Sequence, residues 1–156
     1  MMSGVAELAH ELRPLVFRLY YLVRRHGPRH TLTLTQGSVL AELVAGGPRR
    51  MSVLADLEGV RLPSLTDVVT RLERDGLVIR VPDPADRRAV LVSVTAQGRR
   101  FYDELVAARE EFLRERLSVL PPEDRGAIEL AIPALRRLLV PSSTKETKEE
   151  VPADER

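Results

Sequence analysis

The spacing of apolar residues changes at Gly76, and this change constrains the fold more than any other feature of the sequence. Across 62–75 the apolar positions recur every three or four residues, which predicts an amphipathic helix with one buried stripe. Residues 77–81 and 89–94 alternate instead, as half-buried strands do. A helix followed directly by a β-hairpin is therefore expected. The expected stripe consists of Leu65, Val68, Val69 and Leu72.

Helical periodicity also accounts for most of the chain on either side of this segment. The expected helices are one over 5–26 ended by Gly27 and Pro28, one capped by Thr35 and stopped at 46–48, one capped by Ser52 and ended by Gly59, one capped by Thr95 over 96–118, and one opened by Pro121 and Pro122. Pro14 should kink or restart the first helix, and Pro133 should kink the last. The predicted fold class is mainly α with a small β-hairpin, and the polar tail 141–156 is expected to be disordered.

Composition excludes several classes of protein. A length of 156 residues suggests one domain, or one compact unit with a dimerising extension. Because the chain has no cysteine, it has no disulfide, thiolate metal site or thiol redox sensor. The N-terminus does not resemble a signal peptide, and no apolar run approaches the roughly 18 residues of a membrane span. We therefore expect a cytoplasmic protein.

Enzymatic and metal-dependent functions are not expected either. The sequence contains no nucleophile elbow, phosphate-binding glycine loop or metal-ligand motif. His26 and His30 are four residues apart, but Gly27 and Pro28 break the helix that would align them. No catalytic residue, metal site or cofactor is predicted.

A short helix that ends at Gly59 and the helix over 62–75 have the spacing of a helix-turn-helix. The face of 62–75 opposite its apolar stripe is then free to enter a DNA major groove, which is about 12 Å wide. Hydroxyls, an acid and arginines on this face can bond to base edges or phosphates. The alternative is an ordinary solvated face. The predicted DNA-binding residues here are Pro63, Ser64, Thr66, Asp67, Thr70, Arg71 and Arg74.

The loop of the hairpin carries two adjacent arginines, Arg87 and Arg88. Guanidinium groups suit the minor groove, whose negative potential attracts them. Asp86 can hydrogen-bond one of these arginines and hold it extended, and prolines at 82 and 84 restrict the loop. We therefore predict a DNA-binding wing over 82–88, with an ordinary charged turn as the alternative.

Three segments together resemble the MarR family of bacterial winged-helix regulators. They are LTLTQGSVLAEL, VRLPSLTDVVTRLERDGLV and DPADRRAVLVSVTAQGR, within a resemblance that covers about 5–140. The resemblance implies a homodimer built from 5–26 and 96–140, with 62–75 as the recognition helix. Arg88 matches the arginine of the family's Asp-x-Arg pattern, with Asp86 as its orienting partner. It also implies repression at pseudo-palindromic operators and release by a small, often phenolic or anionic, ligand.

The resemblance implies four segments along the chain. They are an N-terminal dimerisation helix in 1–30, a winged helix-turn-helix domain in 31–95, C-terminal dimerisation helices in 96–140 and a tail in 141–156. One departure concerns the start of the recognition helix, where Arg61 and Leu62 stand in place of the family's Ser or Thr. We therefore expect Arg61 to contact phosphate.

In this family the ligand pocket lies between the dimerisation helices and the winged domain. Aromatic residues of the first and fifth helices are candidates to line it, and an ordinary apolar core is the alternative. Arg18, Arg24 and Arg25 could attract an anionic effector there. The candidate pocket residues are Phe17, Tyr20, Tyr21, Phe101 and Tyr102.

Sequence reasoning therefore favours a homodimeric, sequence-specific DNA-binding transcriptional regulator, a repressor released by a small aromatic or anionic effector. The alternative is a winged-helix protein-interaction module that does not bind DNA. An arginine-bearing wing favours the first hypothesis, because a protein-docking domain does not need one.

Overall fold

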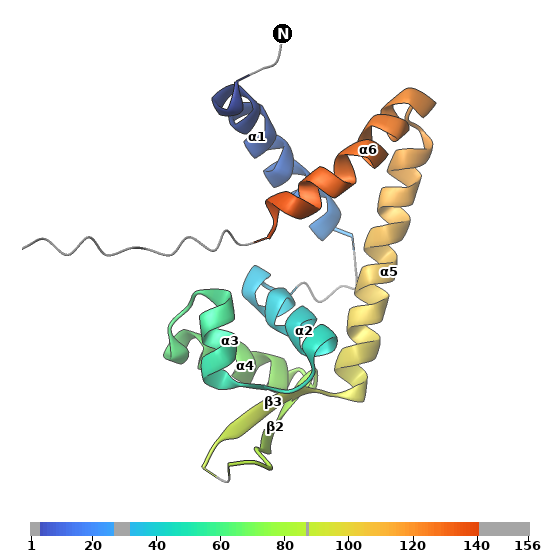
Figure 1. Cartoon of the computed structure of the whole chain (residues 1–156). Coiled ribbons are helices and arrows are strands. Elements are labelled where there is room, and N and C mark those ends of the chain that lie inside the picture. Colours follow the sequence, from blue (N-terminus) through green and yellow to red (C-terminus); the bar gives the residue numbers. More distant parts are fainter. Residues whose placement is uncertain (1–3, 27–31, 87, 141–156) are drawn as a thin grey trace, which may run out of the picture. The chain divides into compact units, whose positions relative to one another are not determined.

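A computed structural model describes residues 4–26, 32–86 and 88–140 of the chain (Figure 1). Helices dominate these residues, and the predicted fold class is confirmed: mainly α, with a small antiparallel sheet. The elements are α1 (Val5–Arg24), α2 (Leu34–Gly46), β1 (Arg49–Arg50), α3 (Met51–Glu58), α4 (Leu62–Arg74), β2 (Val78–Pro82), β3 (Val90–Val94), α5 (Ala96–Ser118) and α6 (Pro122–Leu138).

The sheet has three strands in the order β1-β3-β2, with β3 pairing antiparallel to both neighbours. The predicted hairpin forms β2 and β3, which pair from Val78 opposite Val94 to Pro82 opposite Val90. Strand β1 was not predicted, because two residues are too short to show an alternating pattern. Its Arg50 pairs with Leu91 of the hairpin, so the segment before α3 is tied to the wing.

The core lies between α2, α3, α4 and the sheet, and Figure 1 shows these helices gathered above the hairpin. Leu65, Val69 and Leu72 of the predicted α4 stripe are fully buried, and Val68 packs partly against the same core. Each such side chain contributes about 1.5–3 kcal/mol when it leaves water. The other fully buried large side chains are Leu40, Leu43, Leu54, Val39, Val78 and Val92.

Two of the predicted helix caps are wrong, and one is confirmed. Thr33 rather than Thr35 caps α2, because its hydroxyl accepts from the Gln36 N–H (3.2 Å) while the Gln36 side chain accepts from the Thr33 N–H (2.8 Å). Ser52 does not cap α3, which begins at Met51 directly after β1. Thr95 does cap α5, since its hydroxyl accepts from the Gly98 N–H at 2.9 Å.

Prolines do not divide the long helices. Pro14 lies inside α1, which is continuous from Val5 to Arg24, so the restart allowed for at this residue does not occur. Pro133 likewise lies inside α6. The predicted stop at Gly27 and Pro28 falls outside the described residues, and α1 ends before it.

The described residues fall into two compact units, one up to Glu115 and one from Arg116 onward. The first contains α1 to α4, the sheet and most of α5. The second contains the end of α5 and the whole of α6, which begins at Pro122 and has Glu123 and Asp124 in its first turn, as predicted. No helix in 4–26, 32–86 or 88–140 is long and apolar enough to cross a membrane. The tail 141–156 lies outside the described residues.

Candidate nucleic-acid interface

Helix α4 presents its polar face to solvent because its apolar stripe packs against the core. The stripe holds the helix by one side, so residues on the other side are available to a ligand. All of the residues that we predicted on that face, together with Arg61 before the helix, are exposed. They are Arg61, Pro63, Ser64, Thr66, Asp67, Thr70, Arg71 and Arg74.

The side chains on this face differ in what they already contact. The Thr66 hydroxyl donates to the Leu62 carbonyl of its own helix at 2.9 Å. The Thr70 hydroxyl accepts from Arg80 at 3.0 Å. Within the described part of the chain, Ser64, Asp67 and Arg71 have no side-chain hydrogen bond or ion pair. The face therefore combines free groups with groups that are already held in place.

Arg80 of β2 connects the wing to α4, a role that sequence reasoning missed. Its guanidinium donates to the Glu73 carboxylate and to the Thr70 hydroxyl, and its backbone N–H donates to Glu73 at 3.2 Å. The signal was an acid and an arginine on either side of the Gly76 turn, seven residues apart. These bonds set where the wing begins relative to the face of α4.

Hydrogen bonds within the wing loop fold it into a compact turn. The backbone N–H of Asp83 donates to the Ala89 carbonyl at 3.0 Å, and the N–H of Ala89 donates to the Asp86 carbonyl at 2.9 Å. Each aspartate carboxylate also accepts an N–H from two residues further on: Ala85 at 2.8 Å for Asp83, and Arg88 at 3.0 Å for Asp86. Arg88 lies at the end of this turn, and its side chain is exposed.

Among the described residues, the Asp86 carboxylate accepts the backbone N–H of Arg88 at 3.0 Å, and this bond orders the loop backbone. A guanidinium nitrogen of Arg50 lies 4.0 Å from the same carboxylate. Arg87, the other predicted wing arginine, lies outside the described residues.

Arg50 of β1 forms a two-nitrogen contact with Asp83 at the base of the loop. Its Nε and one terminal nitrogen lie 2.8 Å and 2.6 Å from the same carboxylate oxygen. Asp83 is only 6% exposed. The Ala85 N–H, and after it the Arg50 guanidinium, lower the pKa of the Asp83 carboxyl below its usual 3.8. This contact could not be predicted from the sequence, because the two residues are 33 positions apart.

Two of the five candidate pocket residues line two different cavities. Tyr20 lines a hollow of about 310 Å³ formed by residues of α1 and α5, whereas Phe101 lines a different hollow of about 290 Å³ beside Leu77 and Gln97. Phe17 and Tyr21 are more than half exposed. Tyr102 and Phe101 are partly buried and pack against the core. Spacing along a helix does not determine which cavity a side chain enters.

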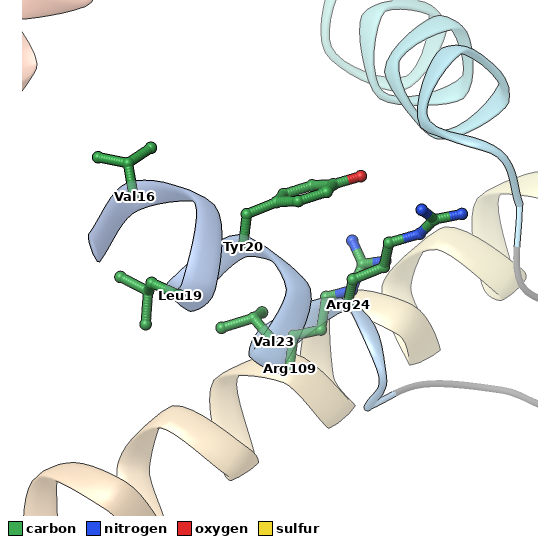
Figure 2. Close-up of a pocket in the computed structure, with 6 residues that line it drawn as sticks. All are labelled: Val16, Leu19, Tyr20, Val23, Arg24 and Arg109. Carbon is green, nitrogen blue, oxygen red and sulfur yellow. The ribbon is translucent and has the colours of Figure 1, made fainter. Parts of the chain in front are cut away.

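The hollow at Tyr20 has mostly apolar walls, and the polar groups among its lining residues are the Tyr20 hydroxyl and two arginines, as Figure 2 shows. Arg24 of α1 donates to the Leu32 carbonyl at 3.0 Å. The Nε of Arg109 of α5 is buried, and among the described residues it has no hydrogen-bond partner. Of the arginines that we expected near an effector, Arg24 lines this hollow, whereas Arg18 and Arg25 are exposed elsewhere on the chain. Sequence reasoning missed Arg109. The other lining residues are Val16, Leu19 and Val23.

Comparison with known proteins gives a consistent result. The family model described as the MarR family matches residues 32–90. The HTH-type transcriptional regulator Mb0904 of Mycobacterium bovis is 37% identical over 131 residues, which cover 84% of this chain and 92% of the relative. The homoprotocatechuate degradative operon repressor of Escherichia coli is 34% identical over 87 residues, which cover 56% of this chain and 59% of the repressor.

A solved structure agrees over nearly the same length. It is that of Bordetella bronchiseptica BpsR, whose DNA binding is regulated by 6-hydroxynicotinic acid. The two folds match with a TM-score of 0.62 at 29% identity, covering 87% of this chain and 93% of BpsR.

Proposed function

Since the chain belongs to the MarR family of DNA-binding transcriptional regulators, which are not enzymes, we propose that it is a homodimeric repressor that a small ligand releases from its operator. The observation that carries this proposal is the exposed polar face of α4 beside an ordered, arginine-bearing wing. Its place of action is the cytoplasm, where the chromosomal DNA of a bacterium lies.

The α4 helix reads the major groove and the wing enters the minor groove. Ser64, Asp67 and Arg71 are the α4 side chains best placed for base contacts, because they are exposed and not engaged elsewhere in the described chain. Asp67 can accept from the amino group of cytosine. Arg61 contacts phosphate, and Arg88 of the wing contacts the minor groove, whose potential is negative.

Residues of 1–30 and 96–140 form the dimer interface. Helices α1 and α6 contain no buried residue, although both carry many large apolar side chains. On α1, Leu8, Leu15 and Leu19 are each more than half exposed, and on α6, Leu130 is 83% exposed. Apolar exposure on this scale marks a surface that a partner covers. A two-fold dimer would place its recognition helices about 34 Å apart on a pseudo-palindromic operator.

An anionic aromatic ligand fits the hollow at Tyr20. The apolar walls and the tyrosine ring suit an aromatic ring, and the guanidinium groups of Arg24 and Arg109 suit a carboxylate. Repression, and its relief by such a ligand, are supported by two relatives: one is named an operon repressor, and DNA binding by the other is regulated by 6-hydroxynicotinic acid.

Fluorescence anisotropy against duplexes tiled across the DNA that flanks the gene tests this function. Measurements at two salt concentrations, with a scrambled competitor, separate specific from counterion-driven binding. We expect tight binding to one tile that survives competition. Weak binding to every tile that collapses with salt would contradict the proposal and favour a protein-interaction module.

A further inference from the structure

The contact between Arg50 and Asp83 connects parts of the fold that lie at opposite edges of the sheet. Arg50 belongs to β1, and Asp83 follows β2, with β3 between these two strands. The Arg50 side chain therefore passes the central strand to reach the base of the wing loop. This contact is separate from the hydrogen bonds that pair the strands.

Asp83 uses both carboxylate oxygens to hold the loop. One oxygen accepts the two Arg50 nitrogens, and the other accepts the Ala85 N–H. The Asp83 backbone also bonds to Ala89 and Asp86. Because the Asp83 side chain is only 8% exposed, an unpaired carboxylate there would be unfavourable, so the arginine is needed as its partner.

We propose that Arg50 and Asp83 form a clamp that positions the wing, and through it Arg88, for the minor groove. Arg88 follows directly from the turn that Asp83 and Asp86 organise. A loop that is ordered before binding loses less conformational entropy when it meets DNA. The inference rests on the proposed DNA-binding function, and it makes Arg50 and Asp83 positioning residues rather than DNA contacts.

For one substitution, the clamp and a direct contact of Arg50 with DNA phosphate predict opposite changes in operator affinity. Asp83→Asn removes a negative charge and frees the Arg50 cation, so charge alone would tighten DNA binding. The asparagine side chain has an NH2 group in place of one carboxylate oxygen, so in either orientation this donor faces the Ala85 N–H or the Arg50 guanidinium and one of the two bonds is lost. We therefore expect Asp83→Asn to weaken operator binding about tenfold, the size of one lost arginine contact.

A matched control and a double-mutant cycle make this test specific. Asp56→Asn removes the same charge from an exposed position on α3, outside the wing, so its operator affinity should be unchanged or higher. In an Arg88→Ala background, Asp83→Asn should have little further effect, because the clamp acts through Arg88. Unchanged or tighter binding by Asp83→Asn, or full additivity with Arg88→Ala, would overturn the proposal.

Hydrogen exchange of the DNA-free protein tests the clamp without reference to function. The Ala85 and Ala89 N–H groups should exchange about tenfold faster in Asp83→Asn and in Arg50→Gln than in the wild type, with a single cooperative melting transition showing that both variants fold. Unchanged exchange at both groups would refute the clamp. If the wild type bound no operator, the proposed function would fail, while exchange would still decide whether the clamp orders the loop.

Discussion

At the scale of single residues, the α4 side chains that can discriminate between bases are those that are not already hydrogen-bonded within the described part of the chain. Thr66 and Thr70 are already bonded within the protein, so they offer less to a base edge than Ser64, Asp67 and Arg71 do. An acceptor such as Asp67 favours cytosine through its amino group. Discrimination should therefore be concentrated in these three side chains.

Replacing Asp67 by Ala should change base preference at one defined position in each half-site, by about 1–3 kcal/mol between the preferred and the next base pair. The change is measured by competition with single-substitution operator duplexes. Asp56→Ala is a matched control, since it removes an exposed acid from α3 instead. Asp56→Ala should keep the base preference of the wild type. An altered preference in both variants, or in neither, would contradict base readout by Asp67.

The stability that Asp83 contributes should depend on pH in a definite window. Its carboxyl has a lowered pKa, chiefly because the Ala85 N–H and then Arg50 bond to the charged form. Its contribution is therefore complete above the unfolded value of 3.8 and is lost as the pH falls through the lower folded value.

The difference in free energy of unfolding between the wild type and Asp83→Asn should be constant from about pH 5 to pH 8 and should narrow below about pH 3.8. Urea unfolding at a series of pH values measures it. A difference that already shrinks between pH 7 and pH 5 would show that another group controls this site.

At the scale of elements, the start of α5 packs against the turn after α4 with no space for a side chain. A Cβ atom on Gly98 would lie 2.0 Å from the Leu77 carbonyl oxygen, which belongs to the backbone and cannot rotate away. The Thr95 hydroxyl donates to the Gly76 carbonyl at 2.7 Å in the same region. This contact fixes where α5 begins relative to the hairpin.

Gly98→Ala should therefore destabilise the protein by about 1–3 kcal/mol, although alanine favours helices. Gly37→Ala is the control, because a Cβ there meets nothing within 4 Å inside α2, and it should stabilise by about 0.5–1 kcal/mol. Thermal unfolding of both variants measures these changes. If the melting temperatures of both variants shifted equally and in the same direction, helix propensity rather than packing at Leu77 would control stability at Gly98.

At the scale of the whole molecule, the exposed apolar faces of α1 and α6 require a partner for burial. Leu15→Glu places a charge on α1 at a residue that is 61% exposed in one protomer. If α1 lies in the dimer interface, this variant should sediment as a monomer at micromolar concentration and lose operator binding. Leu57→Glu on α3, which is 57% exposed, should remain dimeric. A monomeric Leu57→Glu or a dimeric Leu15→Glu would contradict the proposed interface.

Ligand response also belongs to this scale, because it couples the hollow to DNA binding. Small aromatic carboxylates, 6-hydroxynicotinate among them, should release the wild type from its operator. Arg109→Gln should keep operator affinity but lose the release, because the Arg109 guanidinium would bind the carboxylate. Arg18→Gln, an exposed site on α1, should respond as the wild type does. Full release of Arg109→Gln would exclude this hollow as the effector site.

Features that the sequence by itself determined are those set by residues close together along the chain. Helix α4, with its buried stripe, the hairpin and the Thr95 cap depend on periodicity and on hydrogen bonds that span a few residues, so they could be predicted. The exposed face of α4 follows from the same stripe, since a helix buried on one side must present the other.

Tertiary structure alone decided the features that depend on distant residues. Arg50 and Asp83 are 33 positions apart, and only the pairing of β1 with β3 brings them together. The packing of helix on helix likewise separated Tyr20 from Phe101 and placed Arg109 beside Arg24. A local pattern carries no information about such neighbours, because they are determined by how the elements pack in the folded chain.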